Sequence, residues 1–185
     1  MAQTTTVVID DDTAGQPQII RVSSLAAATS YTSPTWAAEY YRKILFEVHG
    51  VIAVTGAVYD WVLWRANNVA SQYMDIADVI NSGSNVESSN FAATTDARIA
   101  AMNTSAGAPL GIWISGEFLP RISSGGRLGK ALSVVTERTG TSILHQLKRD
   151  TEFAWSDTST ALTSFKITFP ASVTFTGTVV VKGET

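Results

Sequence analysis

The chain has 185 residues, of which 45% are hydrophobic and only 16% are charged, and its formal net charge is −3. This length fits one domain, or one domain with an arm, and allows a core without covalent staples. The mild negative charge argues against duplex nucleic acid as a partner, because phosphate binding needs a basic surface. The absence of cysteine excludes a disulfide framework, a thiolate zinc site, an iron–sulfur cluster and a cysteine nucleophile.

The N-terminus, Met1 to Thr6, has neither the basic region nor the apolar region of a signal peptide. No run approaches the ~20 apolar residues of a membrane span. We therefore expect a soluble protein that does not use Sec export. The 23 threonines and 19 serines favour β structure, because threonine suits a pleated, half-buried surface.

Residues 1–43 differ from the rest of the chain. Two short strand-like runs, residues 7–9 and 19–22, flank a turn-like segment at residues 10–17. Ser33-Pro34 then has the pattern of a helix N-cap followed by proline, so one or two helical turns or an extended arm are both open. We predict an N-terminal arm over residues 1–43 that lies on the main domain or on a neighbouring subunit.

From residue 44 onward apolar residues recur at every second position, as in β-strands. Residues 58–64 are apolar on both faces except for Asp60, which is typical of a central strand covered on both sides. The polar stretch 66–95 contains an apolar run at residues 74–80 that could be a strand or a helix. Residues 110–118 and the pair 131–137 and 142–147, joined by a turn with Gly140, also read as strands.

Two closing runs alternate most clearly, residues 164–169 and 173–182, with apolar side chains on one face and mostly hydroxyls on the other. That alternation is typical of an antiparallel sheet with one wet face. No long amphipathic helix intervenes and no heptads occur. We predict an all-β, two-sheet antiparallel sandwich, jelly-roll-like, over residues 44–185, preceded by the extended arm.

Catalytic, metal-binding and cofactor-binding residues are not predicted. His49 and His145 have no ligand-type partner at metal-site spacing, and no Gly-x-Ser-x-Gly elbow accompanies them. Asp10-Asp11-Asp12 reads as a solvated turn, because calcium loops alternate their ligands. The segment 124–131 resembles a phosphate-binding loop, but it lacks the first glycine and the final hydroxyl, and we expect a β-turn with two exposed cations.

The five tryptophans are the remaining candidates for recognition. Trp61 and Trp64 have opposite strand parity, so at least one is expected in the core, and Trp113 lies opposite in parity to its apolar neighbours. Tryptophan is enriched at interfaces and can stack on sugar rings when exposed. Possible glycan or subunit contacts are therefore Trp36, Trp64 and Trp113.

The closing third of the chain resembles the closing strands of β-sandwich virion proteins of tailed bacteriophages. The similar features are a Trp followed by a hydroxyl-rich Asp-Thr turn and Ala-Leu-Thr-Ser (residues 155–164), an alternating strand, and a Gly-flanked final strand (residues 177–183). Residues 60–65 and 71–73 are similar to an early strand and loop of the same sandwich. Lys182 departs from the pattern, since an aromatic residue is common before the last glycine.

The resemblance implies a virion protein, made in the host cytoplasm, that forms a homo-oligomer, with a trimer expected, and that contacts a major capsid or tail protein. A short chain without a coiled coil favours a capsid decoration (cement) protein anchored by residues 1–43. The alternatives are a tail-fibre or tail-tip protein that recognises host surface glycan, and a small carbohydrate-binding or polysaccharide-degrading domain. Expected cofactors are none, and neither nucleic acid nor a membrane is an expected partner.

Overall fold

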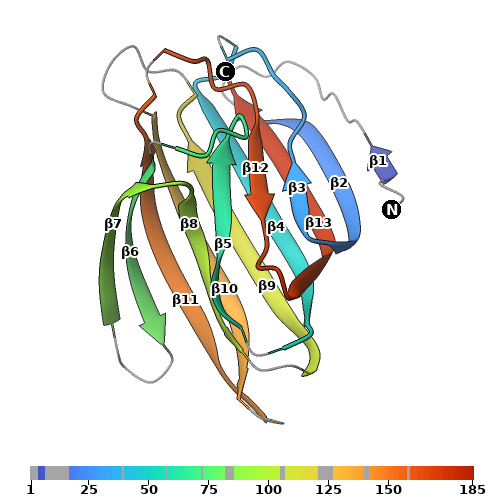
Figure 1. The fold of residues 1–185 in the computed structure, drawn as a ribbon. Helices are drawn as coiled ribbons and strands as arrows, with labels where there is room; N and C mark the ends of the chain where they lie inside the picture. Colours follow the sequence, from blue (N-terminus) through green and yellow to red (C-terminus); the bar gives the residue numbers. More distant parts are fainter. Residues whose placement is uncertain are drawn as a thin grey trace.

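The computed structural model describes residues 4–6, 17–38, 40–56, 58–71, 73–81, 86–104, 107–120, 127–139, 142–157 and 159–185. These residues form two antiparallel β-sheets that pack face to face (Figure 1). The described residues contain no helix, and therefore none that is long and apolar enough to cross a membrane. The prediction of an all-β, two-sheet antiparallel sandwich is confirmed.

The large sheet has nine strands and the small sheet has four. In spatial order the large sheet contains β1 (Thr4–Thr6), β2 (Gln18–Ala28), β13 (Val173–Glu184), β4 (Lys43–Val54), β9 (Gly107–Phe118), β10 (Arg127–Thr139), β11 (Ser142–Trp155), β6 (Tyr73–Asn81) and β7 (Val86–Thr94). The small sheet contains β3 (Ser30–Thr32), β12 (Phe165–Thr168), β5 (Val58–Ala66) and β8 (Ala97–Thr104). The chain crosses repeatedly between the sheets, as in jelly rolls.

The core lies between the inner faces of the two sheets, and strand parity decides which residues reach it. On β4, β9 and β13 every second side chain is buried, so the alternation read from the sequence is confirmed there. Phe165 of β12 occupies the centre, with its ring centroid 5.3 Å from that of Phe46 and 5.7 Å from that of Phe118. Aromatic pairs at such separations add stability beyond the area that they bury.

Two inner-face glycines make room for core rings. A Cβ atom on Gly116 of β9 would lie 2.2 Å from a ring carbon of Phe46, and one on Gly129 of β10 would lie 2.4 Å from a ring carbon of Phe153. Each aromatic ring therefore covers a neighbouring strand at a point where that strand has no side chain. The interior is densely packed at these two points because glycine leaves the space that each ring fills.

The N-terminal segment is not an arm over residues 1–43. β2 pairs along β13 in the large sheet, and β3 pairs with β12 in the small sheet. Residues 17–38 and 40–43 therefore belong to the sandwich, and the expected boundary between residues 43 and 44 is wrong. Both strands pair with the C-terminal part of the chain, and a pairing over that sequence separation leaves no local signal.

None of the described residues that follow Ser33-Pro34 is part of a helix either. The hydroxyl of Ser33 accepts a hydrogen bond from the backbone N–H of Phe165, at 2.9 Å, instead of capping a helix. The backbone N–H of Trp36 donates to the carbonyl of Thr163, also at 2.9 Å. The segment thus runs beside the chain that leads into β12, which holds it in an irregular, extended form.

The ambiguous middle of the chain is also β structure. The run at residues 74–80 is part of β6, which pairs with β11 on one side and β7 on the other. The expectation that β5 is covered on both sides is wrong. Val62 and Trp64 are buried on one face, whereas Trp61 and Leu63 on the other face are only half-buried and Asp60 is exposed. The hairpin predicted around Gly140 is confirmed by the pairing of β10 with β11.

Candidate functional site

The outer face of the large sheet is the candidate functional site, because Trp113 projects from it. The buried neighbours of Trp113 on β9, Ile112 and Ile114, point into the core, so Trp113 points to the opposite side. Its side chain is 39% exposed, and that of Val51 on the adjacent strand β4 is 41% exposed. A single exposed apolar residue is common, but a contiguous apolar patch marks a candidate interaction surface.

The strand register places Trp113 in the middle of a row that crosses the sheet. His49 of β4 lies directly opposite Trp113 on one side, and Val134 of β10 lies opposite it on the other. Thr178 of β13 continues the row beyond His49. Directly opposed residues of antiparallel strands have their Cβ atoms about 5 Å apart, so these side chains form one continuous surface.

Small side chains border the tryptophan along its own strand. Gly111 and Ser115 are the next residues of β9 on the same face, and Gly111 lies beside Thr136 of β10. We call this surface the Trp113 patch. It consists of His49, Val51, Gly111, Trp113, Ser115, Val134, Thr136 and Thr178. It contains no Lys, Arg, Asp or Glu.

Charged side chains of the same face gather next to the Trp113 patch, and we call them the charged belt. The belt consists of Lys43, Glu47, Glu117, Lys130, Lys182 and Glu184. Lys182 lies 2.8 Å from Glu47, and Glu117 lies between Lys43 (3.4 Å) and Lys130 (3.3 Å). These charges are paired within the chain, whereas the exposed Lys148 of β11, directly opposite Val134, borders the Trp113 patch on its other side.

The other two tryptophans proposed as contacts lie in the core. Trp64 is 1% exposed, and Trp36 is 7% exposed with its indole N–H donating to the carbonyl of Leu162 at 3.0 Å. Neither ring can meet a glycan or a subunit, so the prediction is wrong for both. Strand parity correctly separated Trp61 from Trp64, but it could not tell which of the two was inside.

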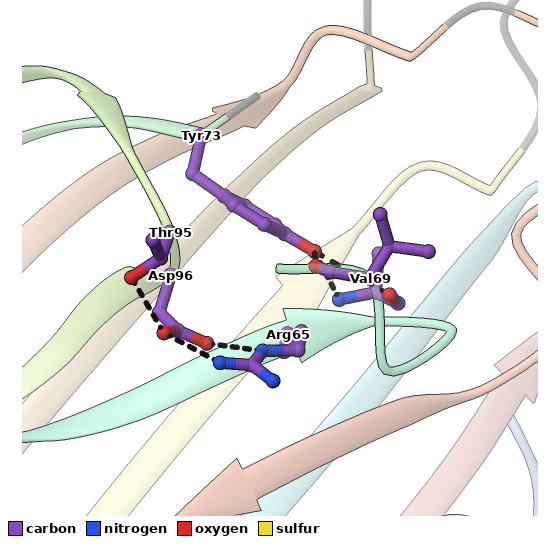
Figure 2. A network of polar contacts seen from close by, with 6 residues as sticks. Arg65, Val69, Tyr73, Thr95 and Asp96 are labelled. Carbon is purple, nitrogen blue, oxygen red and sulfur yellow. Dashed lines mark hydrogen bonds and ion pairs between the residues drawn. The ribbon is translucent and has the colours of Figure 1, made fainter. Parts of the chain in front are cut away.

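A second polar cluster, at one end of the sandwich, was not predicted (Figure 2). Arg65 of β5 donates two hydrogen bonds to the carboxylate of Asp96, at 2.5 and 2.9 Å, and the hydroxyl of Thr95 donates to the same carboxylate. The hydrogen bond to Asp96 raises the pKa of Arg65. Asp96 is buried, so this fork joins the end of β5 to the start of β8. A separation of 31 residues hides the pair from sequence patterns.

Tyr73 closes the turn that follows β5. Its hydroxyl accepts from the backbone N–H of Ala66 at 2.8 Å and donates to the carbonyl of Val69 at 2.6 Å (Figure 2). Burial is the largest cause of a raised pKa for Tyr73, so the phenol stays protonated and serves as a structural donor. In the same turn Asn67, at a φ of 46°, holds the backbone of residues 163 and 164 through its side-chain oxygen.

The segment that carries the resemblance, residues 155–164, is held in place by hydrogen bonds and by a cation–ring contact. The guanidinium of Arg127 donates to the carbonyls of Asp157 and Thr160 and lies 4.9 Å from the centre of the Trp155 ring. Asp157 accepts from the backbone N–H groups of Ser159 and Thr160. Arg127 is buried at the start of β10, which corrects the expectation of two exposed cations, whereas Lys130 is exposed as expected.

A buried cation was missed as well. Arg149 lies on the inner face of β11, donates to the hydroxyl of Thr151 at 2.9 Å, and places its guanidinium carbon 4.3 Å from the centre of the Trp61 ring. A desolvated cation over an indole contributes about 2 kcal/mol. The charged run at residues 148–150 looks like a solvated segment, yet residue 149 shares the inward parity of Leu147 and Phe153.

Among the described candidates, His49 has no catalytic partner directly opposite it in the sheet. The direct cross-strand neighbours of His49 are Thr178 and Trp113, so no serine or aspartate faces it there. Among the residues that the structure describes, no group of three or more His, Asp or Glu could hold a metal ion. Asp10-Asp11-Asp12 and the side chain of His145 lie outside the described part of the chain.

Comparisons with known proteins add no relative: no family model matches the chain, and no curated protein or solved structure matches it.

Proposed function

We propose that this chain is a structural protein of the exterior of a tailed-phage particle, a capsid decoration protein that associates with copies of itself through the Trp113 patch. The observation that carries the proposal is the uncharged surface around a 39% exposed Trp113. The resemblance of the closing strands supplies the phage setting. Because β2 and β3 belong to the sandwich, we assign the anchoring role only to the residues that precede β2.

The two halves of the outer face support self-association. Protein interfaces place aromatic and apolar residues at their centre and polar residues at their rim. The Trp113 patch has that central character, and the charged belt beside it has its cations and carboxylates already paired. A second copy can therefore cover the patch without leaving the charges of the belt unpaired, which would be costly.

The mass of the native protein tests the proposal, together with the matched substitutions Trp113→Ala and Leu128→Ala. Leu128 is 54% exposed on the same face but outside the Trp113 patch. We expect a homo-oligomer, with a trimer implied by the resemblance, that dissociates at least 10-fold more readily in Trp113→Ala and is unchanged in Leu128→Ala. A wild-type chain that stays monomeric at high micromolar concentration contradicts the proposal.

Location on a particle needs a separate measurement. Immunogold labelling of intact particles with an antibody against this chain is expected to decorate the head surface. Labelling confined to the tail tip would replace decoration by adhesion as the role. An absence of the chain from purified particles would remove the phage assignment altogether.

A glycan-binding function is the second candidate, and the surroundings of Trp113 favour it. Gly111 has no side chain beside Trp113 on the same face of β9, while Ser115, Thr136 and Thr178 offer hydroxyl groups in the Trp113 patch. A glycan array probed with the wild type and with Trp113→Ala separates the two functions. Binding that is lost in the variant while the native mass stays unchanged would favour a tail-tip or carbohydrate-binding protein.

A further inference from the structure

The first strand of the chain is held to the sandwich in an unusual way. β1 consists of three residues and pairs only with Val22, Ser23 and Ser24, at the edge of the large sheet (Figure 1). The eight other residues of the eleven-residue β2 have no partner in β1. The contact between β1 and β2 therefore depends on a short run of backbone hydrogen bonds.

The link between β1 and β2 has more residues than a usual hairpin loop. Antiparallel neighbours in a hairpin are usually joined by loops of about 2–5 residues. Here residues 7–17 separate the two strands, and fifteen residues separate Thr6 from its partner Val22. Eleven residues can span up to about 36 Å, which is as long as β2 itself, so the connection can reach the same edge of an adjacent copy.

We infer that β1 is exchanged between copies: in the assembled oligomer, β1 of one copy pairs with the β2 edge of a second copy. This inference rests on the proposed self-association. The same backbone register serves both arrangements, because the donor strand is chemically identical in each. A linker of eleven residues gives its own strand an effective concentration on the order of millimolar, and β1 of an adjacent copy competes with it for the same edge.

The lack of native cysteine allows a direct test with two single-cysteine variants, Thr4→Cys and Ser24→Cys. Thr4 and Ser24 are register partners, and paired antiparallel residues have Cα separations that a disulfide can bridge. In a mixture of the two variants, refolded together and oxidised, a Thr4–Ser24 disulfide can form only between copies. We expect a covalent dimer in close to half of the refolded chains, which is the most that random mixing of equal amounts of the two variants allows.

A matched control replaces Ser24→Cys by Lys148→Cys. Lys148 is exposed on the same face but belongs to β11, five strands away from β2. The pair Thr4→Cys and Lys148→Cys is expected to give at least 10-fold less dimer. Equal yields in the two mixtures would mean random collision and would overturn the inference.

The double variant Thr4→Cys/Ser24→Cys and the native mass distinguish the ways in which the idea can fail. Suppose that the wild type is an oligomer, that the double variant forms its disulfide only within single chains, and that the mixture of single variants gives no covalent dimer. This result refutes strand exchange but not self-association. A monomeric wild type refutes both proposals. A double variant that forms no disulfide at all refutes the β1–β2 register and the inference with it.

Discussion

Arg65 and Asp96 share two hydrogen bonds, of 2.5 and 2.9 Å, between the guanidinium of one strand and the buried carboxylate at the start of another. Such bidentate pairs are stronger than single contacts and more demanding in geometry. We expect Asp96→Ala to lower the free energy of unfolding by about 2 kcal/mol, because it removes the hydrogen bonds to the Arg65 charge, which is itself partly exposed. Urea unfolding followed by tryptophan fluorescence measures the loss.

The exposed pair Lys182 and Glu47 is the matched control for that prediction. Its nitrogen and oxygen are 2.8 Å apart, but both side chains are partly exposed. Glu47→Ala should therefore cost no more than about 1 kcal/mol. Double-mutant cycles over the two pairs compare the coupling energies, and equal values would show that the Arg65–Asp96 fork has no special role.

Tyr73→Phe is predicted to destabilise the protein without removing any packing. The substitution leaves the backbone N–H of Ala66 and the carbonyl of Val69 without the phenol oxygen that they bond. Losing a buried partner costs about 1–3 kcal/mol. Tyr40, which is 69% exposed, provides the control, and Tyr40→Phe should leave the melting temperature unchanged.

Gly116→Ala should show that the ring of Phe46 needs the space at residue 116. The added methyl group would lie 2.2 Å from that ring, and overpacking a core costs about 1–3 kcal/mol. Phe46→Leu in the same chain removes the clash, so the double variant should be less destabilised than the sum of the two single variants. Strict additivity in the unfolding free energies would contradict the assigned contact.

The hydroxyl of Thr160, followed by its N–H and the donors of Ser159, lowers the pKa of Asp157 from its ordinary 3.8. A lowered pKa means that ionised Asp157 stabilises the fold above pH 3.8 and that this contribution is lost as the pH falls through the folded-state pKa. Asp157→Asn keeps the acceptor oxygen but removes the charge. Wild type and variant should differ at pH 7 and converge at low pH in unfolding free energy, whereas a constant difference would refute the charge effect.

The fold was largely readable from the sequence, because it depends on alternation. The alternation of residues 173–182 places Val179 and Val181 in the core and Thr178 outside, as the structure confirms. Parity alone does not say which side of a strand is inside, so Trp64 could be separated from Trp61 but not assigned to the core. The strand pairings of residues 17–43 were missed because their partners come from the far end of the chain.

The candidate site was readable only in part, for a related reason. Trp113 was singled out because its apolar neighbours alternate with it, and the structure leaves it exposed. The patch around it depends on register, since His49 and Val134 become its neighbours only when β4 and β10 align beside β9. Long-range polar pairs such as Arg127 with Asp157 have no local signature for the same reason.

The position of β13 between β2 and β4 has a consequence for biosynthesis. β13 leaves the ribosome after the twelve other described strands, so β2 and β4 keep unpaired edges until β13 has been synthesised. Unpaired edges of this kind invite pairing with other chains. A chain truncated near residue 172 would therefore be prone to aggregation, whereas loss of the first few residues would leave the pairing of β13 with β2 and β4 intact.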